Sequence, residues 1–242
     1  MSAVAEAPPV AAPAAGDAPA AEDRPAVRPA AARRPAVPGL TLADLVAKFG
    51  PIPASRIVSD PAPGTATPAD HERLNAAGRG IFELIDGTLI EKPVSDLSSW
   101  FDGEIFRLLA NHVTERKLGW VHPGTAFFNL PDGLRAPDAS FTPRDRRESG
   151  LQARGYSNVP PALVAEVVSP GNTRREMELK RSVYFAAGVE TVWEVDPLAR
   201  TVTVWTGPDA DTVLREGDML TGAPTLPEFS LPLRDLFAEA AG

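Results

Sequence analysis

The chain has 242 residues, of which 43% are hydrophobic and 23% are charged, with a formal net charge of −8 and no cysteine. This length allows one substantial domain or two small ones, and the lack of cysteine excludes disulfides, thiol nucleophiles and thiolate metal sites. With only three histidines, a metal ion would be held mostly by oxygen. The acidic balance argues against a broad basic surface that coats nucleic acid, although it leaves room for a local basic cleft.

Residues 1–38 are dominated by alanine and proline. Prolines remove helix hydrogen bonds and alanines offer little apolar area, so we expect a disordered tail over 1–38 and a single domain over 39–242. A docking arm is the alternative for the tail. No apolar run approaches the roughly 18–20 residues of a membrane helix, and no signal peptide is predicted. We therefore expect a cytoplasmic protein with no membrane partner.

Helical spacing, capping residues and turn residues predict the elements of the first half of the domain. An Asp-Gly pair between two alternating apolar runs is a strong hairpin signal. The expected elements are a helix over 41–50 with Thr41 as its N-cap and Gly50 as its stop, a loop over 51–70, a hairpin over 82–92 around Asp86-Gly87, and a long helix over 96–117.

Alternating apolar runs predict most of the second half. Two strands are expected first, then a polar, arginine-containing loop, and further strands follow a central stretch described below. The expected elements are strands over 119–130 and 136–142 with a turn at 131–133 between them, a loop over 143–159, strands over 191–197 and 200–207, a short strand around Val213-Leu214, and a final helix over 233–240.

The central stretch, residues 160–187, places two charges where apolar residues are expected. Residues 162–168 are apolar except for Glu166, as in a strand buried on both faces. Thr173 and Glu176 form a capping box that predicts a helix, and Lys180 falls in the middle of the apolar arc of that helix. Glu166 could be a structural carboxylate paired with an arginine, and Lys180 could extend its stem to water. Alternatively, the helix packs back on the sheet and the two charges meet.

Asp138 is a third candidate, because it follows Pro137 at the start of a predicted strand. An aspartate in this position can also be an ordinary turn residue. Two carboxylates suit a hard ion such as Mg²⁺, and a lysine can stabilise charge at a phosphate. The three residues together therefore indicate metal-assisted hydrolysis of a phosphodiester.

Four stretches resemble the Uma-two family of putative restriction endonucleases, a branch of the PD-(D/E)XK nuclease superfamily. They occur in the order of the family and span roughly residues 80–240. The stretches are FELIDGTLIEKP, RAPDASF, PPALVAEVVSPGNTRREMELKRSVYFAAGVETVWEVDP with RTVTVW, and LPEFSLPLRDLF. The histidine that often precedes the long helix in the family is absent from this chain.

The resemblance implies a restriction-endonuclease-like α/β fold, with a mixed β-sheet flanked by helices and a C-terminal β extension. It implies that Asp138 and Glu166 hold the metal together with the main-chain carbonyl of Val167. The lysine of the superfamily, whose usual place is Val168 here, is moved to Lys180. Further candidates are Glu83 and Glu176 at the site, and Arg144, Arg174 and Arg175 as phosphate contacts.

The expected function is that of a Mg²⁺-dependent endonuclease acting on DNA, with Mn²⁺ as a substitute ion. Two alternatives remain at this point. One is a catalytically weak or inactive nuclease-fold module that binds or assembles, and the other is a phosphohydrolase acting on small phosphates. A homodimer is the expected assembly, because nucleases often cut two strands.

Overall fold

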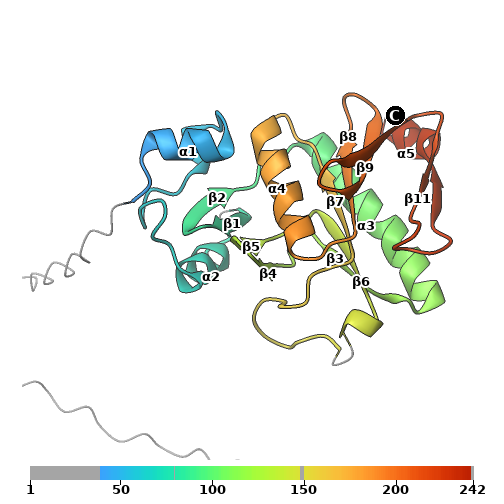
Figure 1. Cartoon of the computed structure of the whole chain (residues 1–242), viewed down its shortest axis with the longest axis horizontal. Helices are drawn as coiled ribbons and strands as arrows, with labels where there is room; N and C mark the ends of the chain where they lie inside the picture. Colours follow the sequence, from blue (N-terminus) through green and yellow to red (C-terminus); the bar gives the residue numbers. More distant parts are fainter. Residues whose placement is uncertain (1–38, 79, 148–149, 241–242) are drawn as a thin grey trace, which may run out of the picture. The chain divides into compact units, whose positions relative to one another are not determined.

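The computed structural model describes residues 39–78, 80–147 and 150–240, so the predicted tail lies outside the described residues. Figure 1 shows the arrangement of the elements. The helices are α1 (Leu42–Phe49), α2 (Pro68–Ala76), α3 (Asp96–Arg116), α4 (Arg174–Ala186) and α5 (Leu233–Glu239), with short 3-10 turns η1 (Ala54–Arg56) and η2 (Asp145–Arg147). The strands are β1 (Phe82–Ile85), β2 (Thr88–Glu91), β3 (Gly119–Pro123), β4 (Phe128–Leu130), β5 (Gly133–Arg135), β6 (Ala139–Pro143), β7 (Leu163–Val167), β8 (Thr191–Asp196), β9 (Thr201–Gly207), β10 (Ala210–Arg215), β11 (Met219–Thr221) and β12 (Ser230–Pro232).

A six-stranded sheet forms the centre of the fold, with the strand order β10-β9-β8-β7-β6-β3. β7 and β8 run parallel, and the other neighbours are antiparallel. The α4 helix is the crossover between the two parallel strands, as a parallel pair requires. The predicted fold class, a mixed sheet flanked by helices, is confirmed.

β7 is buried along its whole length because a helix covers each face of the sheet. Leu163, Ala165 and Val167 belong to one apolar cluster with the buried residues of α3. Val164 belongs to a second cluster with Val183 and Tyr184 of α4. Since side chains alternate along a strand, Glu166 points to the face that carries α4.

The predicted hairpin is confirmed and belongs to a second, antiparallel sheet with the order β2-β1-β5-β4. Its two turn residues, Asp86 and Gly87, have φ values of 44° and 73°. This left-handed pair suits Asp-Gly and matches the twist of the strands.

The single strand predicted over 119–130 is wrong, because the structure divides it between the two sheets. β3 ends at Pro123, where a turn with a hydrogen bond from the amide of Ala126 to the carbonyl of Pro123 redirects the chain into β4. The turn predicted at 131–133 joins β4 to β5, not to the strand after Asp138. The irregular Pro-Gly pair at 123–124 is the sequence signal for this break.

The loop predicted over 51–70 is also partly wrong. The α2 helix begins at Pro68, with Thr67 and Asp70 forming a capping box. The helices predicted over 41–50, 96–117, 173–187 and 233–240 are confirmed. Among the described residues, no helix is long and apolar enough to cross a membrane.

Candidate functional site

The Glu166 carboxylate accepts two hydrogen bonds from side chains of α4. Its Oε2 atom lies 2.6 Å from the Lys180 ammonium, and its Oε1 atom accepts a short hydrogen bond from the Tyr184 hydroxyl. All three side chains are buried. The capping box of α4 fixes where the helix starts, and the four-residue spacing of Lys180 and Tyr184 places both on one face. The predicted meeting of Lys180 with Glu166 is thus observed.

Asp138 lies beside the end of β7 and has a lysine partner that the sequence analysis did not identify. Its Oδ1 atom lies 2.6 Å from the Lys92 ammonium, and its Oδ2 atom accepts a 2.7 Å hydrogen bond from the amide of Val167. Lys92 also donates to the carbonyl of Ala136 at 2.6 Å. The structure therefore connects Asp138 directly to the residue that follows Glu166.

Both lysines remain ammonium ions at neutral pH. Burial alone would lower the pKa of Lys180, but the charges of Glu166, Glu83 and Asp138 raise it overall. Burial would likewise lower the pKa of Lys92, and Asp138 contributes most to raising it. Burial raises the pKa of Glu166; the charge of Lys180 opposes this shift and that of Asp138 adds to it. The lysines can therefore stabilise negative charge, but they cannot accept a proton.

Glu83, a further candidate from the sequence, supports the segment that leads to Asp138. Its Oε2 atom pairs with Arg135 at 3.1 Å, and its Oε1 atom accepts from the amide of Ala136 at 3.0 Å. Burial would raise the pKa of Glu83, but Lys180, Arg135 and Lys92 lower it to about 2. Glu83 is therefore ionised at neutral pH. Its two oxygens bind Arg135 and Ala136, in the segment just before Asp138.

Asp102 of α3 is a second group that the sequence analysis missed. Its Oδ1 atom is buried and has no hydrogen-bond partner among the described residues. Burial raises the pKa of Asp102 to about 8, and the charges of Asp138 and Glu166 add to this shift while Lys92 opposes it. Asp102 therefore lies within electrostatic reach of the cluster and can exchange a proton near neutral pH.

The donor chemistry of the cluster fits Mg²⁺. Among the described residues, no three Asp, Glu or His side chains are close enough to hold an ion by themselves. Mg²⁺ usually keeps several waters and is held through one or two carboxylates, which Asp138 and Glu166 supply. Asp102 is not part of such a set, although the charges of Asp138 and Glu166 influence its pKa. Each of the four oxygens of Asp138 and Glu166 also accepts a hydrogen bond from the protein, so a bound ion would share or displace these contacts.

Glu176 does not join the cluster. Its carboxylate is buried and pairs with Arg56 at 2.5 Å. Burial would raise the pKa of Glu176, but the hydrogen bond from Arg56 lowers it overall. Arg56 also donates to the carbonyls of Glu91 and Gly171. Glu176 therefore anchors α4 to the segment that precedes β1.

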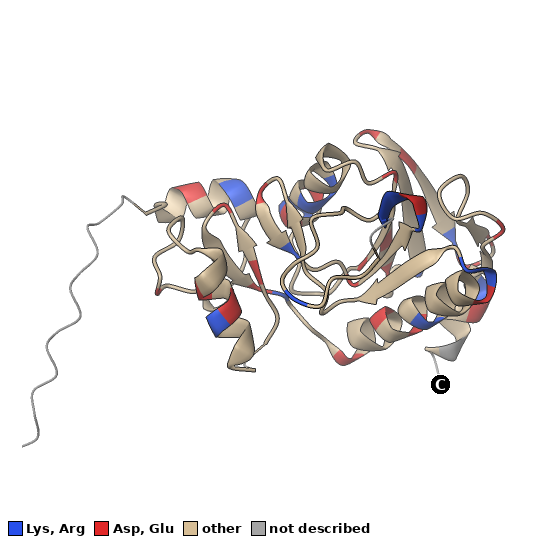
Figure 2. Ribbon diagram, turned by 90° about the horizontal axis from the view of Figure 1, so that it is seen from below, with Lys and Arg blue, Asp and Glu red and all other residues tan. Residues whose placement is uncertain are grey.

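The arginines expected to contact phosphate have other surroundings. Arg174 and Arg175 are exposed and pair with Glu178 on the same helix. Arg144 follows β6 at the end opposite to Asp138, and its guanidinium lies 5.2 Å from the ring centre of Trp120. Acidic and basic residues are interspersed along the ribbon (Figure 2). The structure does not bring these three arginines together with the carboxylates.

Comparison with solved structures supports the class of fold that this site occupies. The crystal structure of a putative nuclease belonging to DUF820 from Anabaena variabilis ATCC 29413 matches with a TM-score of 0.60 and 20% sequence identity. The match covers 66% of this chain and 91% of that one. The fold is therefore that of a nuclease-like α/β protein.

Comparison with models of protein families identifies the family of the chain. The Uma2 model, described as putative restriction endonuclease, matches residues 68–234. The chain belongs to the Uma2 family, as the resemblance predicted. No curated protein matches the chain significantly.

Proposed function

We propose that the chain is a Mg²⁺-dependent endonuclease that hydrolyses phosphodiester bonds of DNA. The supporting observation is a buried cluster at the end of β7, in which Asp138 and Glu166 each carry a lysine within 2.6 Å. A structural ion pair needs one lysine and one carboxylate, whereas this cluster has two of each, and their charges influence the pKa of Asp102. Membership of a nuclease-like family agrees with this proposal.

Asp138 and Glu166 would hold the metal together with the main-chain carbonyl of Val167. When bound, Mg²⁺ supplies Lewis-acid stabilisation of the phosphate oxygens and favours ionisation of water. The Lys180 ammonium, held on Glu166, stabilises negative charge that develops on the scissile phosphate. Tyr184 fixes the second oxygen of Glu166, so that the carboxylate keeps its orientation.

Asp102 accepts the proton of the attacking water in this proposal. Its pKa of about 8 makes it a stronger base than an ordinary carboxylate, because burial disfavours its charged form. An unpartnered oxygen is also free to receive a hydrogen bond. Lys92 balances the negative charge of Asp138 through its ion pair.

The test is nicking of supercoiled plasmid and of single-stranded circular DNA with Mg²⁺ and with Mn²⁺. Glu166→Gln keeps the size of the side chain and removes its charge, so we expect a loss of at least about a hundredfold in rate. Glu178→Gln, at a half-buried position on the same helix, should retain the wild-type rate. Crystals soaked in Mn²⁺ should show density between Asp138 and Glu166.

One observation favours a second candidate, a nuclease-fold module that binds without cutting. Both oxygens of Asp138 and both oxygens of Glu166 already accept hydrogen bonds from protein donors. Equal nicking by the wild type and Glu166→Gln, together with retained DNA binding, would support this module. Turnover of small phosphate esters without nicking would instead indicate a phosphohydrolase.

A further inference from the structure

A pocket of about 420 Å³ opens beside the strand turn that precedes β4. Its lining comes from the end of β3, from that turn and from the loop after η2, and includes His122, Thr125, Phe127, Arg147 and Tyr156. The turn also adjoins Asp138: a Cβ added at Gly124 would lie 3.4 Å from the carbonyl of Asp138 and 3.8 Å from its Oδ1 atom. The pocket therefore neighbours the candidate site without containing its residues.

Arg147 gives this pocket an unusual charge. The residue is only 4% exposed, and among the described residues its guanidinium has no hydrogen-bond or ion-pair partner. A charged group that is removed from most of the solvent is normally paired with an opposite charge. No Asp or Glu is present among the described residues that line the pocket. Among the residues that the structure describes, no acidic side chain of the lining therefore balances the charge of Arg147.

His122 adds a second polar group without a partner. Its Nδ1 atom is buried and has no hydrogen-bond partner in the described part of the chain. Burial and the nearby charge of Arg147 both lower the pKa of His122. A neutral imidazole can still donate one hydrogen bond, and an anion would relieve the repulsion from Arg147. Arg147 and His122 therefore resemble the two sides of a site for a phosphate group.

Two aromatic side chains of the lining are held by contacts with other rings. The rings of Phe127 and Tyr156 meet edge to face at 6.0 Å, and each also contacts the ring of His71. The hydroxyl of Tyr156 lies 2.9 Å from Nδ1 of His71, which fixes the ring. Aromatic faces beside a cation are the elements that hold an unstacked nucleotide in single-stranded nucleic acids.

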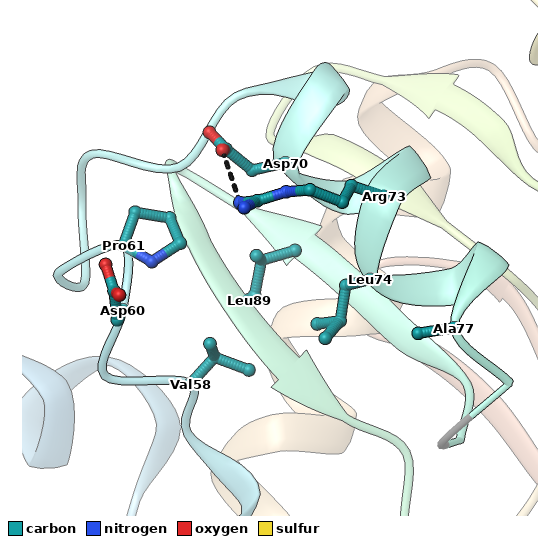
Figure 3. Close-up of a pocket in the computed structure, with 8 residues that line it drawn as sticks. All are labelled: Val58, Asp60, Pro61, Asp70, Arg73, Leu74, Ala77 and Leu89. Atoms are coloured by element: carbon teal, nitrogen blue, oxygen red, sulfur yellow. Dashed lines mark hydrogen bonds and ion pairs between the residues drawn. The ribbon is translucent and has the colours of Figure 1, made fainter. Parts of the chain in front are cut away.

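Another pocket of the described chain has an arginine that is already paired. This cavity has a volume of about 190 Å³. Figure 3 shows residues that line it, among them Asp60, Asp70 and Arg73. Its arginine already pairs with Asp70 at 2.9 Å, so its charge is neutralised within the protein. An anion would therefore bind only weakly to this arginine. The pocket at Arg147 is the better anion site because its arginine has no such acid.

We propose that the pocket at Arg147 binds one unpaired nucleotide of the nucleic-acid substrate, with the phosphate on Arg147 and His122 and the base against Phe127. This inference rests on the proposed function, since it names the form of substrate that the neighbouring site receives. An unpaired nucleotide can enter this pocket directly, whereas a paired one must first be unstacked and unpaired. The chain would therefore favour single-stranded or frayed DNA over an intact duplex.

The experiment measures calorimetric binding of deoxyadenosine 5′-monophosphate, deoxyadenosine and inorganic phosphate to the full chain in EDTA. We expect the monophosphate to bind at least tenfold more tightly than the nucleoside or phosphate alone. Arg147→Met should weaken its binding about tenfold or more, because a charge-assisted hydrogen bond is lost. Arg215→Met, which changes an exposed arginine of β10 outside the lining of the pocket, should bind like the wild type.

A second variant, Gln152→Glu, tests the pocket without a change in the protein core. Gln152 is exposed and lines the same pocket. Its added negative charge should weaken monophosphate binding several-fold while the unfolding midpoint stays unchanged. Absence of monophosphate binding to the wild type, or equal binding by Arg147→Met, would overturn the pocket proposal. Binding that depends on Arg147 in a chain that never nicks DNA would leave the pocket standing and refute the endonuclease.

Discussion

Lys92 determines how readily a cation can reach Asp138. Its ammonium already lies on the Oδ1 atom of that carboxylate and on the carbonyl of Ala136. A divalent ion that uses Asp138 must share or displace this contact. If the proposed metal site is correct, Lys92 would lower the affinity for the ion, while its charge offsets the cost of burying the Asp138 carboxylate.

Lys92→Met should therefore strengthen metal binding. Methionine has a similar length without the charge, so we expect the Kd for Mn²⁺ to fall about tenfold or more, since close charge pairs are worth over a kcal/mol. The metal-free variant should be less stable, because Asp138 loses its counterion. Calorimetric titration with Mn²⁺ measures the affinity, and Lys48→Met, at an exposed pair, is the control. An unchanged Kd would show that the ion does not use the Oδ1 atom of Asp138.

Asp102 should give the folded state a pH dependence. Because its pKa is raised to about 8, the folded chain holds its proton more tightly than the unfolded chain does. Its contribution to stability is present below an ordinary aspartate pKa and is lost as the pH rises through 8. Asp102→Asn cannot ionise, so its free energy of unfolding should exceed that of the wild type increasingly between pH 5 and pH 8. Urea unfolding at several pH values measures the difference; parallel curves would contradict the assignment.

At the scale of the elements, α4 is fastened at its beginning by a buried ion pair. Arg56 bridges the carboxylate of Glu176 and the carbonyl of Gly171, so it joins η1 to the start of the helix. Arg56→Met leaves Glu176 buried without its partner, and we expect a loss of about 3–5 kcal/mol in stability. Arg174→Met, at a pair that is fully open to solvent on the arginine side, should cost less than about 1 kcal/mol.

Urea denaturation of the two variants provides the measurement for this pair. The double variant Arg56→Met with Glu176→Gln should recover part of the loss, because the uncompensated charge is removed as well. Equal stability of Arg56→Met and Arg174→Met would show that α4 does not depend on this contact.

The sequence identifies those elements whose signals are local. The capping box at Thr173 and the apolar arc around Lys180 are enough to predict α4 and its meeting with Glu166. The α2 helix was missed although Thr67, Pro68 and Asp70 carry the same type of signal. The many prolines nearby favour the prediction of a loop. Pro68 is nevertheless compatible with a helix, because it occupies the first helical position, where no amide hydrogen bond is lost.

Lys92 and Asp102 could not be recognised in the same way. Lys92 ends a hairpin, where a lysine is ordinarily exposed, and its burial arises from a contact with Asp138, 46 positions further along the chain. Asp102 lies three residues before Ile105 and seven before Leu109, which is the buried side of α3. That spacing was a usable signal. Its link to Asp138 depends on how α3 packs on the sheet, which no local pattern specifies.

At the scale of the whole molecule, we propose that residues 39–242 fold without the alanine- and proline-rich segment before them. The family model matches only residues 68–234, and the formal charges of residues 1–38 cancel. A chain that lacks residues 1–38 should therefore keep the midpoint and slope of urea unfolding within error. A fall of more than about 1 kcal/mol would show that the segment contributes to the folded state.

Lys180 lies on a helix rather than on β7. Its contact with Glu166 therefore depends on the number of residues between Thr173 and Lys180, but not on the length of the turn before the helix. Each residue turns an α-helix by about 100°, so one deletion between Thr173 and Lys180 would rotate the ammonium away from Glu166. The turn over 169–172 can change length as long as a new N-cap restarts the helix at the same place. Divergence by insertion and deletion should consequently gather in that turn, while the first two turns of α4 keep a fixed length wherever the lysine is retained.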